Sequence, residues 1–116
     1  MKELKIFALI LFISLSMISC QSNSYEELSA IVENPTYEAN VKQIIADNCL
    51  SCHSHTSGNQ PPLLENYDQV KAAITNGSLL AQIHAPSGQG MPTNGRMPQQ
   101  TIDLIDRWVN NGFINQ

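Results

Sequence analysis

The segment Cys49-Leu50-Ser51-Cys52-His53 constrains this chain more than any other, because two thiols and an imidazole stand at a fixed short spacing. Side chains three residues apart lie on one face of a helical turn, so both sulfurs point the same way. The pattern C-x-x-C-H is the attachment signal of a c-type haem. Each thiol forms a thioether with a haem vinyl group, and the adjacent histidine is the proximal ligand of the iron. We therefore expect one covalent haem c, held by Cys49, Cys52 and His53.

Three other uses of the cysteine pair fit the sequence less well. A disulfide between Cys49 and Cys52 would close a very short loop and would stabilise little. A thioredoxin-like redox pair needs a βαβ surround, and no strand pattern is visible in the sequence. A zinc site would draw on the same cysteines together with His55 and His84, but those histidines lack the close spacing found in zinc folds.

The second axial ligand of the iron is expected downstream of the motif. The candidate residues are His55, His84, Met91 and Met97. His55 follows His53 too closely to cross to the other face of the ring, and His84 is expected at the surface. Met91 and Met97 are each followed by proline, in a stretch whose glycines and prolines predict an irregular loop. A methionine there has no helical face to pack into, and its thioether opposite a histidine would favour ferrous iron.

Residues 37–53 resemble the start of a bacterial class I cytochrome c domain. The later Met-Pro loop and the ending Trp108-Val-Asn-Asn-Gly112 resemble the close of the same family. The resemblance covers roughly residues 36–114. It implies a small all-α fold, in which three to four helices wrap around one covalent haem.

The same resemblance bears on the axial ligands. In such domains the distal Met-Pro stands a few residues before the last helix, which favours Met91 as the distal ligand and leaves Met97 as the alternative. A backbone carbonyl, from Pro61 or Pro62, is expected to accept a hydrogen bond from the other ring nitrogen of His53. That contact would fix the tautomer of the imidazole and raise its basicity.

Apolar residues recur at helical spacing in three segments: residues 36–48, 67–76 and 98–112. Thr36 or Asn34 is expected to cap the first helix. A further turn is expected at residues 79–83. The stripe of the last helix consists of Ile102, Ile105 and Val109, flanked by Leu104 and Trp108. The resemblance implies that this helix crosses the first near Trp108, and we expect that side chain to pack in the core.

Residues 1–20 are typical of a signal peptide. Lys2 and Lys5 precede an apolar run over residues 6–18. This run has about the ~7–15 residues of a signal-peptide core. It is shorter than the ~20 residues of a spanning helix, although an N-terminal membrane anchor is the alternative.

The end of that run resembles the cleavage box of bacterial lipoproteins, with Met17 where leucine is usual and Cys20 at the invariant cysteine. The resemblance implies that Cys20 becomes the lipidated first residue of the mature protein, since two or more acyl chains anchor stably. Residues 21–35 would then be a polar tether, and residues 36–116 the cytochrome c domain. We expect export to the periplasmic or cell-surface side of a bacterial membrane.

Charge restricts the partners of the exported chain. Without residues 1–20 it has four basic and nine acidic side chains, and 4 − 9 gives a formal charge of −5. No basic stripe is available to neutralise phosphates, which argues against nucleic-acid binding. An acidic domain instead suggests a redox protein with a basic rim, bound through a transient and salt-sensitive interface.

The expected function is electron transfer, not catalysis. The sequence has no Ser/His/Asp order and no phosphate loop. Coordination by histidine and methionine leaves no open position on the iron, so no small-molecule substrate is expected. The alternatives are a haem-based peroxidase or gas sensor with a labile or absent distal ligand, and a haem-free zinc or interaction module.

Overall fold

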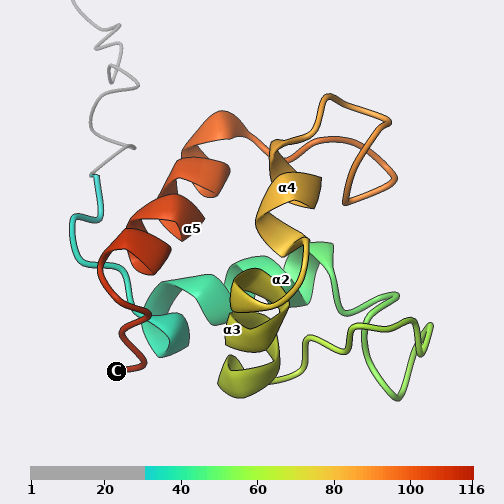
Figure 1. Cartoon of the computed structure of the whole chain (residues 1–116), viewed down its shortest axis with the longest axis horizontal. Helices are drawn as coiled ribbons and strands as arrows, with labels where there is room; N and C mark the ends of the chain where they lie inside the picture. The colour runs from blue at the N-terminus through green and yellow to red at the C-terminus, as the bar shows by residue number, and fades with distance from the viewer. Residues whose placement is uncertain (1–30) are drawn as a thin grey trace, which may run out of the picture. The chain divides into compact units, whose positions relative to one another are not determined.

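Residues 31–116 are described by the computed structural model of the chain, and every regular element in this range is helical. The elements are the π-helical turn η2 (Tyr37–Val41) and the helices α2 (Lys42–Asn48), α3 (Tyr67–Thr75), α4 (Leu79–His84) and α5 (Gln99–Asn110). They form a compact unit over Val32–Gln116 (Figure 1). The all-α prediction is therefore confirmed. The expected signal peptide and Cys20 lie outside the described residues.

η2 and α2 form one continuous helical segment, as the periodicity of residues 36–48 predicts. The Thr36 hydroxyl accepts a hydrogen bond from the backbone N–H of Ala39 at 3.2 Å, so Thr36 is the cap. The first turn is wider than predicted, because Val41 N–H donates to the Thr36 carbonyl oxygen five residues back. Tyr37, Val41 and Ile45 are buried and define the inner face.

α3 and α4 follow one another and are in contact. Asn66 caps α3 by accepting from Gln69 N–H at 3.0 Å. The helix ends before Gly77, where an added Cβ would lie 2.6 Å from the carbonyl oxygen of Ala73. Only glycine allows the chain to pass so close to the helix and begin α4. The turn predicted at residues 79–83 is therefore present as a short helix.

α5 begins at Gln99, directly after Pro98. Ile102, Ile105 and Trp108 are its buried residues. Val109, expected as the third member of the apolar stripe, is only half-buried, and Trp108 takes that place. The reason is that α5 crosses η2, where the indole packs against Tyr37 with 5.9 Å between ring centroids. The predicted crossing and the packing role of Trp108 are confirmed.

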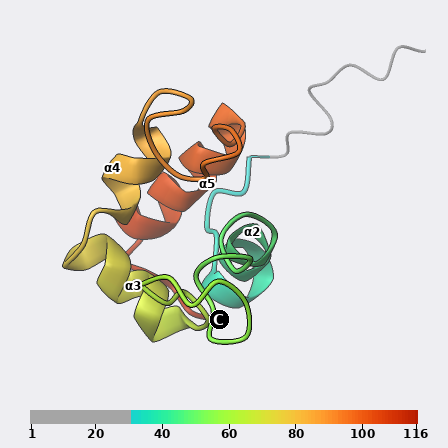
Figure 2. The same ribbon diagram turned by 90° about the vertical axis from the view of Figure 1, so that its right-hand side faces the viewer.

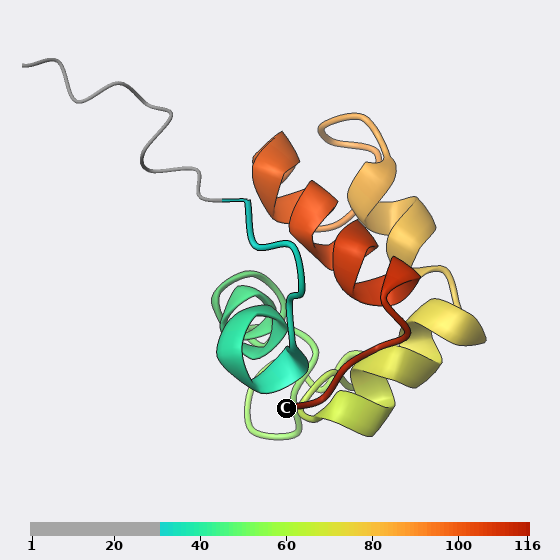
Figure 3. The same cartoon turned by 90° about the vertical axis from the view of Figure 1, so that its left-hand side faces the viewer.

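The C-terminal segment after α5 joins the first and last helices. The carbonyl oxygen of Ile114 accepts hydrogen bonds from Trp108 Nε1 at 2.8 Å and from Tyr37 N–H at 2.9 Å. Tyr67 donates its hydroxyl to the carbonyl oxygen of Phe113, which ties the start of α3 to the same segment. Figure 3 shows this segment running from α5 past α3 towards the first helix.

The residues before η2 also pack on α5. Arg107 Nε donates to the carbonyl oxygen of Val32 at 3.1 Å, and Asn111 Nδ2 donates to that of Glu33 at 2.9 Å. Pro35 is fully buried. We expected residues 21–35 to be a polar tether. Residues 32–35 instead belong to the compact unit, which begins at Val32.

Candidate cofactor site

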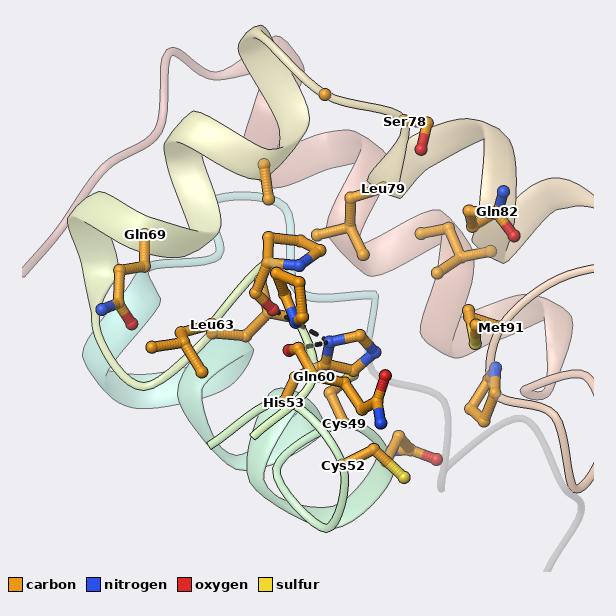
Figure 4. A pocket seen from close by; sticks show the side chains of 18 of the residues that line it. Cys49, Cys52, His53, Gln60, Leu63, Gln69, Ser78, Leu79, Gln82 and Met91 are labelled. Atoms are coloured by element: carbon orange, nitrogen blue, oxygen red, sulfur yellow. Dashed lines mark hydrogen bonds between the residues drawn. The ribbon is translucent and has the colours of Figure 1, made fainter. Parts of the chain in front are cut away.

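A cavity of about 1170 Å³ opens in the unit, larger than the ~300–1,000 Å³ of ordinary small-molecule sites. Figure 2 shows α2 on one side of the unit and α3 with α4 on the other, and these elements all contribute to the cavity wall. Four residues predicted from the sequence line it together: Cys49, Cys52, His53 and Met91. Their side chains are seen in Figure 4.

The two cysteines lie at the end of α2, where the chain continues as a turn. His53 N–H donates to the Cys49 carbonyl oxygen at 2.9 Å, which brings the imidazole over the same turn as the thiols. Both cysteines are free thiols; Cys49 is half-buried and Cys52 is exposed. Burial raises the pKa of Cys49 to about 11, so this thiol stays protonated at neutral pH. The pair is therefore not a disulfide in this structure.

The imidazole of His53 is oriented by two backbone carbonyls. Its Nδ1 lies 2.9 Å from the oxygen of Pro62 and 3.1 Å from that of Gln60. Carbonyl oxygens only accept, so Nδ1 carries the hydrogen and Nε2 keeps a free lone pair. Figure 4 shows that second nitrogen directed into the cavity, towards the side of Met91. The expected carbonyl partner is confirmed as Pro62, and Gln60 is a second one that the sequence did not indicate.

The loop that carries these carbonyls is folded onto the cysteine motif. Gln60 N–H donates to the Cys52 carbonyl oxygen at 2.9 Å, and Leu64 N–H donates to that of His53 at 2.9 Å. An added Cβ at Gly58 would lie 2.7 Å from the Cys52 Cα, so a side chain there would push the loop away. Gly58 therefore permits the approach that positions the Pro62 carbonyl.

His55 and Glu65 close the same loop at its base. One carboxylate oxygen of Glu65 accepts from His55 N–H at 2.9 Å, and the other lies 2.6 Å from His55 Nδ1. The hydrogen bond from the His55 side chain, with that from its backbone, lowers the pKa of Glu65. His55 is exposed, as expected. Its side chain contacts Glu65 and does not line the cavity.

Met91 reaches the cavity from the loop after α4. Within Val32–Gln116 it is the one large hydrophobic side chain that is exposed, at 39 %. Figure 4 shows it at the edge of the cavity, across from His53. Met97 is only 4 % exposed, packs in the core and does not line the cavity. The geometry therefore favours Met91 over Met97 as a ligand.

The position of Met91 depends on a close contact with α4. Its N–H donates to the Gln82 carbonyl oxygen at 3.1 Å. At Gly90, an added Cβ would lie 2.1 Å from the same oxygen and 2.6 Å from Ala85 Cβ. The loop lies flat on the helix only because position 90 has no side chain. The sequence shows that Gly90 precedes Met91, but it does not show that Gly90 lies against Gln82 of α4.

The histidines proposed for a zinc site do not join the cysteines. His84 Nε2 lies 3.0 Å from Asp106 Oδ1 and links α4 to α5. His55 is held by Glu65. In the part of the chain that the structure describes, no three side chains of His, Cys, Asp or Glu converge as a metal site.

The residues of the cavity fit a c-type haem. The donor set comprises two free thiols, an imidazole with Nε2 available and a thioether, which are the groups that attach and coordinate such a haem. The apolar part of the wall includes Leu64, Ala73, Leu79 and Ile83. A flat, largely apolar macrocycle requires both kinds of surface.

Comparison of the chain with protein-family models, curated proteins and solved structures finds no match. The assignment of the site therefore depends on its own residues and geometry. No helix within residues 31–116 is long and apolar enough to cross a membrane.

Proposed function

We propose that this protein is an electron carrier that holds one covalent haem c in the cavity between α2, α3 and α4. The observation that carries the proposal is the meeting of Cys49, Cys52, His53 and Met91 in that cavity. These four residues come from two parts of the chain that are separated by α3 and α4. Their side chains are those that a six-coordinate c-type haem requires.

Each side chain has a separate role in this proposal. Cys49 and Cys52 would attach the haem through thioethers, and His53 Nε2 and Met91 Sδ would coordinate its iron. When bound, the haem supplies reversible one-electron exchange between ferrous and ferric iron. The hydrogen bonds from Nδ1 to Pro62 and Gln60 hold the imidazole in the tautomer that can bind metal.

In this proposal the iron binds no substrate. With a histidine and a methionine as ligands the iron has no open position, so the protein would pass electrons to other redox proteins.

We further propose that the protein is exported and anchored to a bacterial membrane through lipid on Cys20. Labelled fatty acid should be incorporated into the wild type and not into Cys20→Ser, and a wild type without label would contradict the lipid anchor.

The optical spectrum tests the haem and its ligands. The wild type, produced in a host that attaches haem c, should show sharp c-type bands on reduction. It should also show, when oxidised, the weak band near the infrared that marks methionine bound to ferric iron. Met91→Ala should abolish that band, whereas the matched control Met97→Ala should keep it.

Two other results would contradict the proposal. Absence of haem absorbance in the wild type would exclude the cofactor. Rapid binding of carbon monoxide by the reduced wild type would instead indicate an open iron, and would favour the peroxidase or gas-sensor alternative.

A further inference from the structure

The exposed polar residues around the cavity form its mouth, and almost all of them are uncharged. They are Ser51, Gln60, Asn76, Ser78, Thr93 and Asn94, together with Asp47. Among the described residues that line the cavity, Asp47 is the one that has a formal charge at neutral pH. The mouth therefore presents amide and hydroxyl groups, with a single carboxylate at the end of α2.

The other carboxylates lie elsewhere on the unit. Glu38, Glu65 and Asp68 surround a separate depression of about 370 Å³, which Lys42 also lines. Lys42 Nζ is 2.8 Å from Glu38, so part of this charge is already paired. Asp103 and Asp106 are on α5, and no residue of that helix lines the main cavity.

This distribution matters because electrons leave a buried haem most readily where the haem comes closest to the surface. Apart from Asp47, no described carboxylate lines the cavity, and salt at about 0.1–0.15 M screens charges beyond about 8–10 Å. Of this chain's own side chains, a partner that approaches the mouth meets a single charged one, Asp47. Charge steering raises association rates between oppositely charged faces, so the side chains of the mouth should contribute little to it.

We infer that the redox partner docks on the mouth through an uncharged face of its own, made of polar uncharged and small apolar side chains. The inference rests on the proposed function, and it differs from the basic partner that the net charge alone suggests. Contact between two such faces would be held by shape, hydrogen bonds and burial of apolar area, and not by ion pairs. The association should therefore depend only weakly on salt.

The test uses two one-electron oxidants of opposite charge, hexacyanoferrate(III) and tris(phenanthroline)cobalt(III). The reduced, haem-loaded protein gives one electron to each, and the rate is measured by stopped flow at ionic strengths from about 0.1 to about 1 M, where the Debye length falls from about 10 to about 3 Å. We expect either rate to change by less than about threefold, in opposite directions for the two oxidants. Asp47→Asn should remove this residual dependence. Asp103→Asn, which changes the net charge equally but lies on α5, should leave it unaltered.

A second readout does not depend on electron transfer. Hexaamminecobalt(III), a trivalent cation, is added to the oxidised protein and amide chemical shifts are followed by NMR. The shifts should change around Glu38, Glu65 and Asp68, and not around Ser51, Gln60 or Asn94.

Three results would overturn the inference. The first is a change of more than about tenfold with salt that Asp47→Asn and Asp103→Asn reduce equally, because net charge would then control docking. The second is a similar change that neither variant reduces, because the haem's own carboxylates would then charge the mouth. The third is accumulation of the cobalt cation at the mouth. If no haem band appears, or neither oxidant reacts, the proposed function itself fails and the inference fails with it.

Discussion

Nδ1 of His53 lies 2.9 Å from the carbonyl oxygen of Pro62, and this contact decides which ring nitrogen faces the cavity. Because the carbonyl oxygen can only accept, the hydrogen is on Nδ1 and the lone pair on Nε2 is free. The two residues come from different parts of the site, the cysteine motif and the loop that follows it. The loop therefore leaves Nε2 of His53 available as a donor, as the proposed haem site would need.

Gly58 is expected to hold that loop in place. In Gly58→Ala the new Cβ would lie 2.7 Å from backbone atoms of Cys52, so the loop must shift and the Pro62 contact weakens. We expect the free energy of unfolding to fall by about 1–3 kcal/mol. We also expect the reduction potential to rise, since a less basic imidazole stabilises ferric iron less. Urea denaturation and redox titration measure the two effects. Ser57→Ala, at an exposed neighbour, should change neither.

Gly90 is expected to control the distal ligand. A Cβ in Gly90→Ala would lie 2.1 Å from the Gln82 carbonyl oxygen, so the loop must lift from α4 and carry Met91 with it. The band of methionine bound to ferric iron should be lost, and the reduced protein should bind carbon monoxide. Ser87→Ala, in the same loop, is the control. An unchanged band in Gly90→Ala would show that Met91 is not positioned by this contact.

The contact between Glu65 and His55 gives a pH dependence with a defined sign. The pKa of Glu65 is lowered from its ordinary value of 4.5, first by the hydrogen bond from the His55 side chain. A lowered carboxyl pKa stabilises the folded state above the ordinary value, and this contribution is lost as the pH falls through the lowered one. Glu65→Gln should be less stable than the wild type at pH 6. The difference should shrink in acid, below pH 4.5.

Denaturation with urea at a series of pH values measures this difference. Asp103→Asn, on α5, serves as the control for a lost carboxylate. A gap between the wild type and Glu65→Gln that stays constant with pH would show that the contact with His55 does not lower the pKa of Glu65.

The chain without haem is expected to be largely unfolded. A cavity of about 1170 Å³ in so small a unit leaves much of its lining without packing partners. The haem-free double variant Cys49→Ala, Cys52→Ala should therefore give a circular dichroism spectrum with little helix. A native-like helical spectrum would mean that the aromatic cluster around Trp108 suffices to hold the fold.

Trp108 is expected to be structural and not part of electron transfer. It is fully buried, and its Nε1 donates to the carbonyl oxygen of Ile114 at 2.8 Å. Trp108→Phe should lower the free energy of unfolding by about 1–3 kcal/mol, through lost packing and one lost hydrogen bond. The haem bands and the reduction potential should be unchanged. A shifted potential would show that the indole also acts on the cofactor.

Much of the helical structure could be predicted from local sequence. Thr36 was one of the two expected caps of the first helix, and the apolar spacing of residues 67–76 predicted the segment that contains α3; the cap of α3, Asn66, was not predicted. These signals depend on residues that are close together in the chain, so they can be recognised without the tertiary structure. Val109, the third residue of the predicted α5 stripe, packs against the core but is only half-buried, because the crossing with η2 buries Trp108 more deeply.

The spacing of Cys49, Cys52 and His53 is a local property of the chain, so these residues could be predicted as a site for a covalent haem before the fold was known. For the distal ligand, the family resemblance favours Met91 and keeps Met97 as the alternative, since both stand before a proline in one loop. The fold adds that Met97 packs in the core, whereas Met91 is held at the cavity by the contact of its loop, through Gly90, with Gln82. The same holds for the mouth of the cavity, where Asp47 is the single carboxylate. Net charge is a sum over the whole chain, whereas the field that a partner meets depends on where folding places each carboxylate.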